Sequence, residues 1–263
     1  MSSILRRVVE SLSRHIVFRR NLPAPFQEAS ILVSGSCGLA YIFRRMKNVD
    51  PTLIRLVVEY VQEDMIVWDV GANLGLFAAT ASMQVGPNGR VVAFEPDPWL
   101  MSILKQSFGK SQSHFQNIEL EQFAIAEATG QRNFGIARRS RSSNALVGYG
   151  STQMGGARRV VQVQARTLDS FLDSSVPDLL KIDVEGAELE VLRGGKQTLA
   201  DARPIVICEV SSDVTGEVTA LFDSYNYRIF DGHYPREEAV MRSRAPWATV
   251  AVPAEKLTPF AEL

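Results

Sequence analysis

Short apolar runs alternate with amphipathic segments along most of the chain. The apolar runs lie at residues 65–69, 91–95, 118–126, 179–183 and 204–210, and two later ones at 227–230 and 247–252. Segments with apolar positions at helical spacing lie at residues 51–61, 76–85, 98–104, 187–192 and 214–224. Strands buried on both faces have such apolar runs, and their alternation with helices is typical of a parallel sheet. The pattern predicts an α/β fold with a mainly parallel, doubly wound sheet and helices on both faces.

Two regions fall outside this alternation, and the first is the N-terminal stretch of residues 1–50. Apolar and arginine positions at 4–20 predict a basic amphipathic helix that ends before Pro23, and residues 29–43 predict a hairpin or short strands. The helix either packs on the domain or a partner, or rests on an anionic membrane surface. We expect residues 1–50 to form an appendage to a domain at 51–263.

The second region, residues 138–159, contains five arginines, several glycines and serines, and almost no large apolar side chain. We expect a long flexible loop above the carboxyl ends of the strands, acting as a lid ordered by substrate. Its residues Arg138, Arg139 and Arg141 would then grip a negatively charged acceptor through paired hydrogen bonds. The alternatives are a surface insertion, or a neutral acceptor with the arginines solvated.

Composition limits the kind of protein further. With 263 residues, 46% of them apolar, the chain is long enough for one large α/β domain with appendages. The formal net charge of −1 gives no reason to expect nucleic-acid binding. The two cysteines, Cys37 and Cys208, have no metal-binding spacing, and no N-terminal apolar run reaches the length of a signal peptide or membrane span. We therefore expect a cytoplasmic protein; whether it is a homodimer stays open.

Residues 65–75 read M-I-V-W-D-V-G-A-N-L-G, a buried strand followed by a glycine turn and a helix N-terminus. This pattern begins a nucleotide-binding α/β unit, in which Gly71 permits the turn and Gly75 brings the helix close to a ligand. Asp69 would repel a pyrophosphate, and Asn73 stands where a dinucleotide fingerprint has glycine. A carboxylate here suits a positively charged ligand such as S-adenosylmethionine. A strand–turn–helix with a structural role only is the alternative.

Acidic residues end four of the predicted core strands: Asp69, Glu95, Asp183 and Glu209. Ligands of doubly wound sheets bind beyond the carboxyl ends of the strands, so we expect these four side chains at one site. Glu95 lies 20 residues after Gly75, where an acid commonly accepts hydrogen bonds from ribose hydroxyls.

Further candidates lie along the fourth strand and near the C-terminus. Lys181, Asp183 and Glu185 alternate, so they should point to one side as far as the strand persists. Either they form part of the reaction site, or Lys181 simply neutralises a neighbouring acid. His233 is a candidate base if its loop reaches the site; otherwise it is a loop histidine without a role.

Together these segments resemble the FkbM family of S-adenosylmethionine-dependent methyltransferases. The matching motifs are D-V-G-A-N-L-G (69–75), V-V-A-F-E-P (91–96), T-L-D (167–169), L-L-K-I-D-V-E-G-A-E (179–188), V-L-R-G-G (191–195), R-P-I-V-I-C-E (203–209) and V-A-V-P (250–253). The resemblance implies a seven-stranded Rossmann-like sheet whose last strand is antiparallel. It also implies methyl transfer to a hydroxyl of a sugar, glycolipid or small natural product by a methyltransferase domain at 51–263.

On this hypothesis each candidate has a role. The cofactor S-adenosylmethionine is held by Asp69, Gly71, Asn73, Gly75, Glu95, Pro96, Gln122 and Ala124, the last two at the adenine. Asp183 is the first candidate base, with Lys181 and Glu209 beside it, either acting directly or holding Mg²⁺ or another divalent cation together with Glu209. The acceptor would contact Glu185, Arg138, Arg139, Arg141 and His233.

Two other functions compete with this hypothesis. One is a non-catalytic binding module that keeps the cofactor fold, and the other is an NAD-dependent oxidoreductase. Asp69 and the missing glycines disfavour the oxidoreductase.

Overall fold

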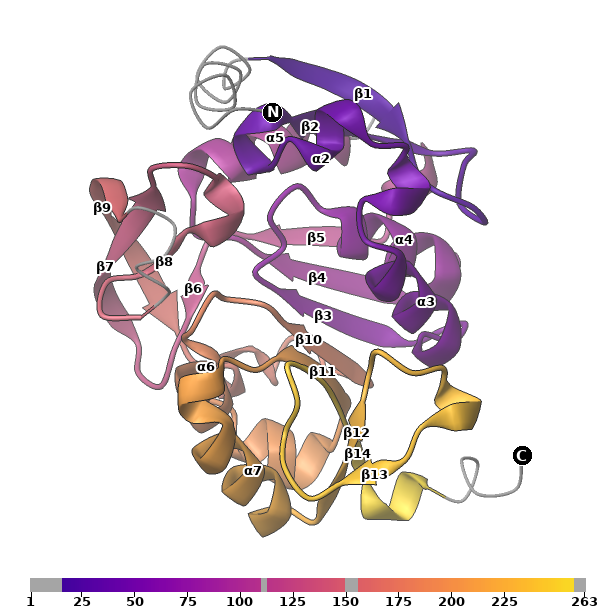
Figure 1. Cartoon of the computed structure of the whole chain (residues 1–263), viewed down its shortest axis with the longest axis vertical. Helices are drawn as coiled ribbons and strands as arrows, with labels where there is room; N and C mark the ends of the chain where they lie inside the picture. Colours follow the sequence, from indigo (N-terminus) through magenta and orange to yellow (C-terminus); the bar gives the residue numbers. More distant parts are fainter. Residues whose placement is uncertain (1–15, 110–112, 150–155, 258–263) are drawn as a thin grey trace.

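An eight-stranded sheet forms the centre of the computed structural model, which describes residues 16–109, 113–149 and 156–257 (Figure 1). In spatial order its strands are β13 (Met241–Arg242), β12 (Tyr227–Asp231), β14 (Ala248–Pro253), β11 (Ile205–Glu209), β10 (Leu179–Ile182), β3 (Ile66–Val70), β4 (Arg90–Phe94) and β5 (Ile118–Glu121). Neighbours from β11 to β5 are parallel, while β14 runs antiparallel to both β11 and β12. The doubly wound sheet with an antiparallel last strand is therefore confirmed. The eighth strand, β13, is a two-residue addition at the edge.

Helices cover both faces of this sheet. Their bounds are α3 (Pro51–Tyr60), α4 (Leu76–Val85), α5 (Pro98–Ser107), α6 (Glu188–Arg193) and α7 (Thr215–Ser224). The first three pack with Val67 on one face, and the other two pack around Trp68 on the opposite face. Because side chains alternate along a strand, these two neighbouring residues of β3 belong to different layers of the core.

For two of these helices, the sequence contains a local signal for the first helical residue. Asp50 caps α3 and Asp97 caps α5, each accepting a hydrogen bond from a backbone N–H of the first turn. A proline follows each aspartate at the first helical position, where its missing N–H costs nothing.

A second, four-stranded sheet stands beside the carboxyl ends of the main strands (Figure 1). Its strands, in spatial order, are β6 (Ala124–Ile125), β9 (Ala157–Arg166), β7 (Gly130–Ala137) and β8 (Ala145–Leu146). The single strand predicted at 118–126 is therefore wrong. Pairing with β4 ends at Glu121, and after two residues the chain pairs with β9 instead.

The prediction of a long flexible loop at 138–159 is also wrong for its described part. Residues 141–143 form a 3₁₀ turn, β8 follows, and the last arginines lie in β9. Small polar side chains supply the hydrogen bonds: Ser140 caps the turn, and Asn144 accepts from the backbone N–H of Ala137 at 2.8 Å. Residues 150–155 of the predicted loop lie outside the described residues.

The N-terminal part begins with the antiparallel pair β1 (Val17–Asn21) and β2 (Ser30–Ser34), followed by the short α2 (Ala40–Phe43). The predicted helix is thus wrong for residues 17–20, where the side chains of Val17 and Phe18 pack on the core from a strand. The rest of the predicted helix, residues 4–15, lies outside the described residues. Within the described ranges, none of the helices has the length and apolar character needed to cross a membrane.

Candidate active site

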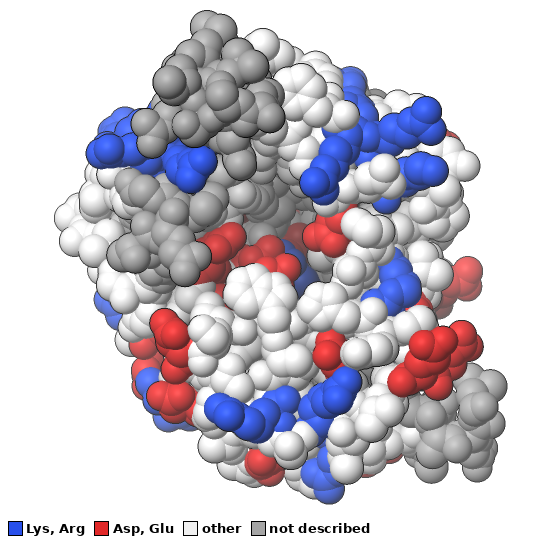
Figure 2. Space-filling model, viewed as in Figure 1, with Lys and Arg blue, Asp and Glu red and all other residues white. Residues whose placement is uncertain are grey.

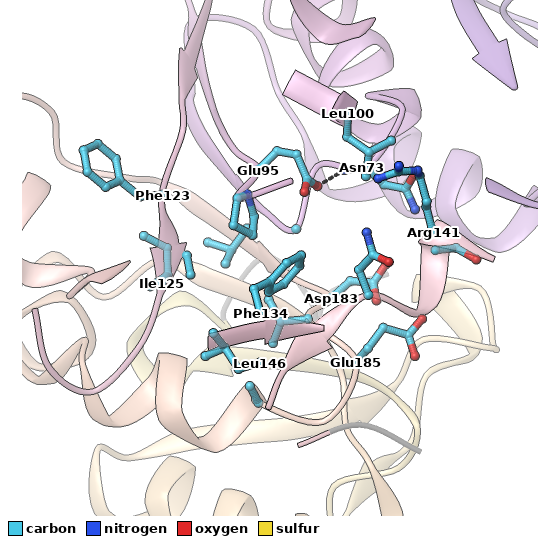
Figure 3. A pocket seen from close by; sticks show the side chains of 18 residues that line it. Asn73, Glu95, Leu100, Phe123, Ile125, Phe134, Arg141, Leu146, Asp183 and Glu185 are labelled. Carbon is cyan, nitrogen blue, oxygen red and sulfur yellow. Dashed lines mark hydrogen bonds between the residues drawn. The ribbon is translucent and has the colours of Figure 1, made fainter. Parts of the chain in front are cut away.

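A pocket lies at the carboxyl ends of β3, β4 and β10, the place where the strand order of the sheet reverses (Figure 3). We call it the β3–β4 pocket. Its lining includes Gly71, Asn73, Glu95, Pro96, Leu100, Phe123, Ala124, Ile125, Phe134, Arg141, Asn144, Leu146, Asp183 and Glu185. Such switch points are where open α/β sheets bind ligands. Most of the cofactor residues expected from the sequence therefore share one pocket.

The turn after β3 brings two strands into close approach. Gly71 has φ +82°, and a Cβ at this position would lie 1.9 Å from the backbone oxygen of Asp183. Its N–H donates to the carbonyl of Phe94 at 3.0 Å. Only glycine allows this turn to touch the end of β10 while remaining hydrogen-bonded to β4.

Asn73 continues the same turn in the left-handed conformation, with φ +52°. Its N–H donates to Glu95 Oε2 at 2.9 Å, and its side-chain oxygen Oδ1 is buried without a hydrogen-bond partner among the described residues. A buried acceptor of this kind costs free energy until a donor reaches it. Because Asn73 lines the pocket, a bound molecule is a natural source of that donor.

Glu95 leaves the end of β4 and lies on the pocket wall, only 4% exposed. Besides Asn73, its carboxylate accepts from the N–H of Asp97 at 2.8 Å. Burial raises the pKa of Glu95 to about 8 against the lowering effect of these two hydrogen bonds. Carboxylate oxygens accept more than one hydrogen bond each, so ligand hydroxyls can still bind here.

Gly75 does not line the pocket, and the contacts of this glycine are with neighbouring side chains. A Cβ there would lie 2.5 Å from Phe108 and 2.8 Å from Leu104. The glycine, at φ +80°, therefore serves the packing of α4 against α5.

Asp69 is also absent from the pocket lining, which does not match its predicted contact with the cofactor. Its side chain is completely buried inside β3, and Oδ1 lies 3.0 Å from the ammonium of Lys181 on the neighbouring strand. Burial raises the pKa of Asp69, and Lys181 opposes that rise. The carboxylate thus orients a lysine.

Lys181 lies at the centre of the charged cluster. Its Nζ donates to the carbonyl of Gly71 at 3.0 Å and lies 3.5 Å from Asp183 Oδ2, in addition to the contact with Asp69. Burial alone would lower the pKa of Lys181, but the carboxylates of Asp69 and Asp183 raise it above its ordinary value. The lysine is therefore a charged positioning group for both acids.

Behind Lys181 lies a second cavity, bounded by the start of α3 and the ends of β11 and β14; we call it the α3 cavity. Its lining includes Asp50, Leu53, Lys181, Glu209, His233 and Trp247. Burial first, and then the charge of Asp183, raise the pKa of Glu209 to about 8. Since Lys181 lines this cavity and Asp183 the β3–β4 pocket, the two residues stand between the two spaces.

The strand β10 persists only to Ile182, so the expected alternation does not extend to Asp183 and Glu185. Glu185 has φ +57° in the loop beyond and lines the β3–β4 pocket. Burial raises its pKa to about 7, with Asp183 contributing next. Sequence reasoning gave no role to Glu188, whose buried carboxylate accepts from Gly186 N–H at 2.7 Å and so supports this loop.

Of the two residues expected at the adenine, one lies in the pocket. Ala124 lines the pocket, whereas Gln122 is exposed and does not. Sequence reasoning missed the apolar wall formed by Leu100, Phe123, Ile125, Phe134 and Leu146. The segment 121–126 already contained two of these side chains, but no signal placed the second sheet here.

The three expected acceptor arginines line one depression together, and among them Arg141 alone also lines the β3–β4 pocket. Arg141 lines the β3–β4 pocket, but its guanidinium forms an ion pair with the buried Asp97 and stacks 4.6 Å from the ring centre of Trp99. Its charge is thus already paired, against the expectation for this residue. Arg138 and Arg139 line a neighbouring depression with Ser36 and Trp99.

His233 lies on the other side, in the wall of the α3 cavity. Its side chain is 55% exposed, with Nδ1 3.1 Å from Asp231 Oδ1. The structure therefore places it near Glu209 and away from the arginines.

The predicted divalent cation does not fit the donors present. Among the described residues, no three His, Cys, Asp or Glu side chains are grouped as a metal site would require. Asp183 instead has the ammonium of Lys181 3.5 Å away. We derive no step through a metal.

Comparison with known proteins finds a protein family whose model matches this chain. Residues 69–229, which include the glycine turn, Lys181 and every residue that lines the β3–β4 pocket, match the family model described as the methyltransferase FkbM domain. The chain belongs to the FkbM methyltransferase family. The resemblance carried by the sequence motifs is confirmed, and this membership argues against an NAD-dependent oxidoreductase.

Several relatives of this FkbM chain are methyltransferases by name. It is 28% identical over 162 residues to the hexuronic acid methyltransferase AglP of Haloferax volcanii, a match that covers 62% of each chain. It is 27% identical over 166 residues to the 2-O-methyltransferase NoeI of Sinorhizobium fredii, covering 57% of this chain and 65% of NoeI. The match therefore spans less than two thirds of either relative.

A solved structure with a similar chain is the methyltransferase FkbM of Methylobacillus flagellatus. The likeness covers 72% of this chain and 43% of that one, with 18% identity and a TM-score of 0.48.

Proposed function

We propose that the protein is an S-adenosylmethionine-dependent O-methyltransferase acting on a hydroxyl of a sugar, glycolipid or small hydroxylated natural product. Family membership and the names of the relatives support methyl transfer to sugar-like acceptors. The observation that carries the proposal is the contact between Lys181, which lines one cavity, and Asp183, which lines the other. We assign the methyl donor to the β3–β4 pocket and the acceptor to the α3 cavity, with the carboxylate of Asp183 on the donor side.

The residues of the β3–β4 pocket fit the cofactor. Asn73 Oδ1 is an unpaired acceptor for an ammonium, Glu95 accepts from ribose hydroxyls, and Phe123 and its apolar neighbours suit an adenine ring. When bound, S-adenosylmethionine would supply a methyl group on a positively charged sulfur, which would keep the electron pair of the C–S bond as the methyl group passes to the acceptor oxygen.

Asp183 is the proposed base. Its side chain is 33% exposed, so it can take the proton that the acceptor hydroxyl loses. The ammonium of Lys181 holds the carboxylate of Asp183 in position, and Asp69 on the neighbouring strand holds that ammonium in turn. Apolar side chains such as Phe134 and Leu146 exclude water from the pocket, and the reaction then depends mainly on alignment of donor and acceptor.

An isotope-transfer assay tests the proposal. The full chain is incubated with S-adenosylmethionine carrying a labelled methyl group and with a panel of simple glycosides, and label is sought in an ether product. Asp183→Asn should lower kcat by about 10²–10⁴-fold, the usual contribution of a general base, with little change in affinity for adenosylhomocysteine. Asp173→Asn, an exposed aspartate away from the site, is the matched control. A chain that binds the cofactor product but labels no hydroxyl acceptor would be a non-catalytic module.

A further inference from the structure

The α3 cavity contains more chemistry than the proposed transfer uses. Apart from Lys181 and Glu209, its walls include Asp50, His233 and Trp247, for which the reaction step has no role. Resting on the proposed function, we propose that this cavity is the acceptor site, that it binds a hydroxyl-rich ring against Trp247, and that its charge selects an amine-bearing or neutral ring over one bearing a carboxylate.

The far wall of the cavity is fixed by backbone hydrogen bonds. Glu209 is paired with Ala248 across β11 and β14, and the N–H of Val210 donates to the carbonyl of Trp247 at 2.8 Å. The N–H of Gly232 donates to the carbonyl of Ala248 at 2.6 Å, which holds the His233 loop against the same strand. The backbone segments that carry Glu209, Trp247 and His233 are therefore fixed around one space.

Helix α3 forms the near wall of the cavity and is hydrogen-bonded to the His233 loop. Arg55 on this helix donates to the carbonyl of Tyr234 at 2.9 Å and also to that of Gly232. Asp50 begins the helix, and its carboxylate accepts from the N–H of Leu53 at 2.9 Å while lining the cavity. A site built from fixed elements needs little reorganisation to bind.

The lining suits a ring with one apolar face and polar edges. Trp247 is 54% exposed, and its indole lines the cavity beside Leu53 and Leu56. A flat aromatic surface can pack against the C–H face of a sugar ring, while carboxylates accept hydrogen bonds from its hydroxyls. Glu209 and Asp50 are placed to be those acceptors.

The charged groups around the α3 cavity are the reason for the expected preference between ligands. Asp50, Glu209 and the neighbouring Asp183 contribute carboxyl groups, whereas Lys181 is the one Lys or Arg among the described residues of the lining. Its ammonium is already shared between Asp69 and Asp183. Figure 2 agrees, because acidic side chains gather in the central hollow and basic ones lie mainly toward its edges.

The titration of Glu209 points the same way. Burial and then Asp183 raise its pKa to about 8, and Lys181 offsets this only in part. The Asp50 carboxyl also has a raised pKa, chiefly through burial. At pH 7 Glu209 is therefore mostly protonated in the ligand-free protein. An ammonium on the ligand would favour its ionised form and gain a charge-assisted contact, while a ligand carboxylate would meet no unpaired Lys or Arg in the described lining, because Lys181 is already paired with Asp69 and Asp183.

Three methyl β-glycosides with the same ring test the proposal: the glucoside, the 2-amino-2-deoxyglucoside and the glucuronide. Their dissociation constants from the full chain are measured at pH 7 with saturating adenosylhomocysteine, by calorimetry and by tryptophan fluorescence. We expect the glucuronide to bind at least about tenfold more weakly than the amino sugar, which corresponds to one lost charge-assisted contact. Trp247→Phe should remove the fluorescence response, since it leaves only Trp68 and Trp99.

Glu209→Gln should raise the dissociation constant of the amino sugar about tenfold while changing that of the glucoside much less. Glu238→Gln makes the same chemical change on an exposed turn near the loop and should change neither. Equal or tighter binding of the glucuronide, an unchanged preference in Glu209→Gln, or binding of none of the three overturns the inference.

The labelled-methyl assay separates this inference from the proposed function. Transfer to the glucuronide in preference to the others would uphold the methyltransferase and overturn the charge selectivity. The expected order of binding without transfer to any hydroxyl compound would uphold the selectivity of the cavity and overturn the methyltransferase.

Discussion

Glu95 and Asp69 illustrate how much depends on a single residue position. Both are acids near the end of a core strand, and the sequence predicts a cofactor contact for both. However, β3 continues to Val70 and encloses Asp69, whereas β4 ends at Phe94 and leaves Glu95 beyond the sheet. A strand end cannot be located from an apolar run to within one residue, and here that residue decides whether a carboxylate meets a ligand or a buried lysine.

Replacing Glu95 by Gln should weaken cofactor binding. The amide keeps the shape but loses the charge-assisted hydrogen bonds to ribose hydroxyls, which we expect to cost about 1.5–3 kcal/mol of binding free energy. Calorimetric titration with adenosylhomocysteine measures the change, and urea unfolding shows whether the domain is intact. Glu127→Gln, an exposed position, is the control. Wild-type affinity in Glu95→Gln would show that this acid has no part in cofactor binding.

The contact between Lys181 and Asp69 should be visible as a coupling in stability. Lys181→Met leaves the fully buried carboxylate of Asp69 without its cation, which should lower the free energy of unfolding by about 3–5 kcal/mol. The double variant Lys181→Met/Asp69→Asn should recover most of this loss, because the buried charge is gone as well.

Urea unfolding of the wild type, both single variants and the double variant completes the cycle. The exposed Lys196→Met provides the control for loss of one ammonium. Additive effects in the double variant would mean that the two side chains do not stabilise each other.

At the scale of elements, the segment around the 3₁₀ turn at 141–143 forms a wall of the β3–β4 pocket. Arg141 pairs with Asp97, and Asn144 donates to the same carboxylate at 2.8 Å. Both donors reach an aspartate that is 1% exposed and that also caps α5. A charged contact to a buried carboxylate fastens this wall to the helix beside the cofactor residues.

Arg141→Gln should therefore act on the cofactor. It leaves Asp97 with a neutral partner only, so the wall should open more often and adenosylhomocysteine should dissociate faster, by about tenfold for a loss near 1.4 kcal/mol. Stopped-flow dissociation measures the rate, and Arg139→Gln, which removes an arginine outside this pocket, is the control. If Arg141→Gln instead raised only the KM of the acceptor, the grip on the acceptor expected from the sequence would be correct.

Elements differ in how well the sequence predicts them. The helices after Asp50 and Asp97 were predicted at their first residue, because the cap and the proline act within one turn. The second sheet was not predicted as a unit, because its contacts are remote. Arg141 contacts Asp97, which is 44 positions away in the sequence, and β6 pairs with β9 rather than with β5. No local pattern encodes such partners.

At the scale of the whole molecule, the fold was predictable because parallel strands buried on both faces need nearly continuous apolar runs. The same logic placed the site at the carboxyl ends, and the structure brings Glu95, Asp183 and Glu209 there. The division of the lining into two cavities was not predictable, since it depends on the contacts of Lys181 with Gly71, at the end of the neighbouring strand, and with Asp183.

The collection of buried acids also sets the pH dependence of the whole fold. The pKa values of Glu95 and Glu209 rise to about 8 and that of Glu185 to about 7, in each case chiefly through burial. Each ordinary value is 4.5, so between these limits the folded chain binds more protons than the unfolded chain. Stability from these groups is therefore fully present below about pH 4.5 and is lost as the pH rises through 7 to 8. The pKa of Glu255 shifts the other way, to about 2, so its titration changes the stability only at pH values below this window.

We expect the free energy of unfolding of the ligand-free protein to fall between pH 5 and pH 8, by an amount on the order of a few kcal/mol. Urea unfolding at intervals of half a pH unit measures the slope. Glu209→Gln should flatten it, because the amide does not titrate, whereas Glu238→Gln on the exposed turn should leave it unchanged. A stability that increases toward pH 8, or an equal slope in Glu209→Gln, would mean that these carboxyl groups are ionised in the folded protein and that other charges already compensate them.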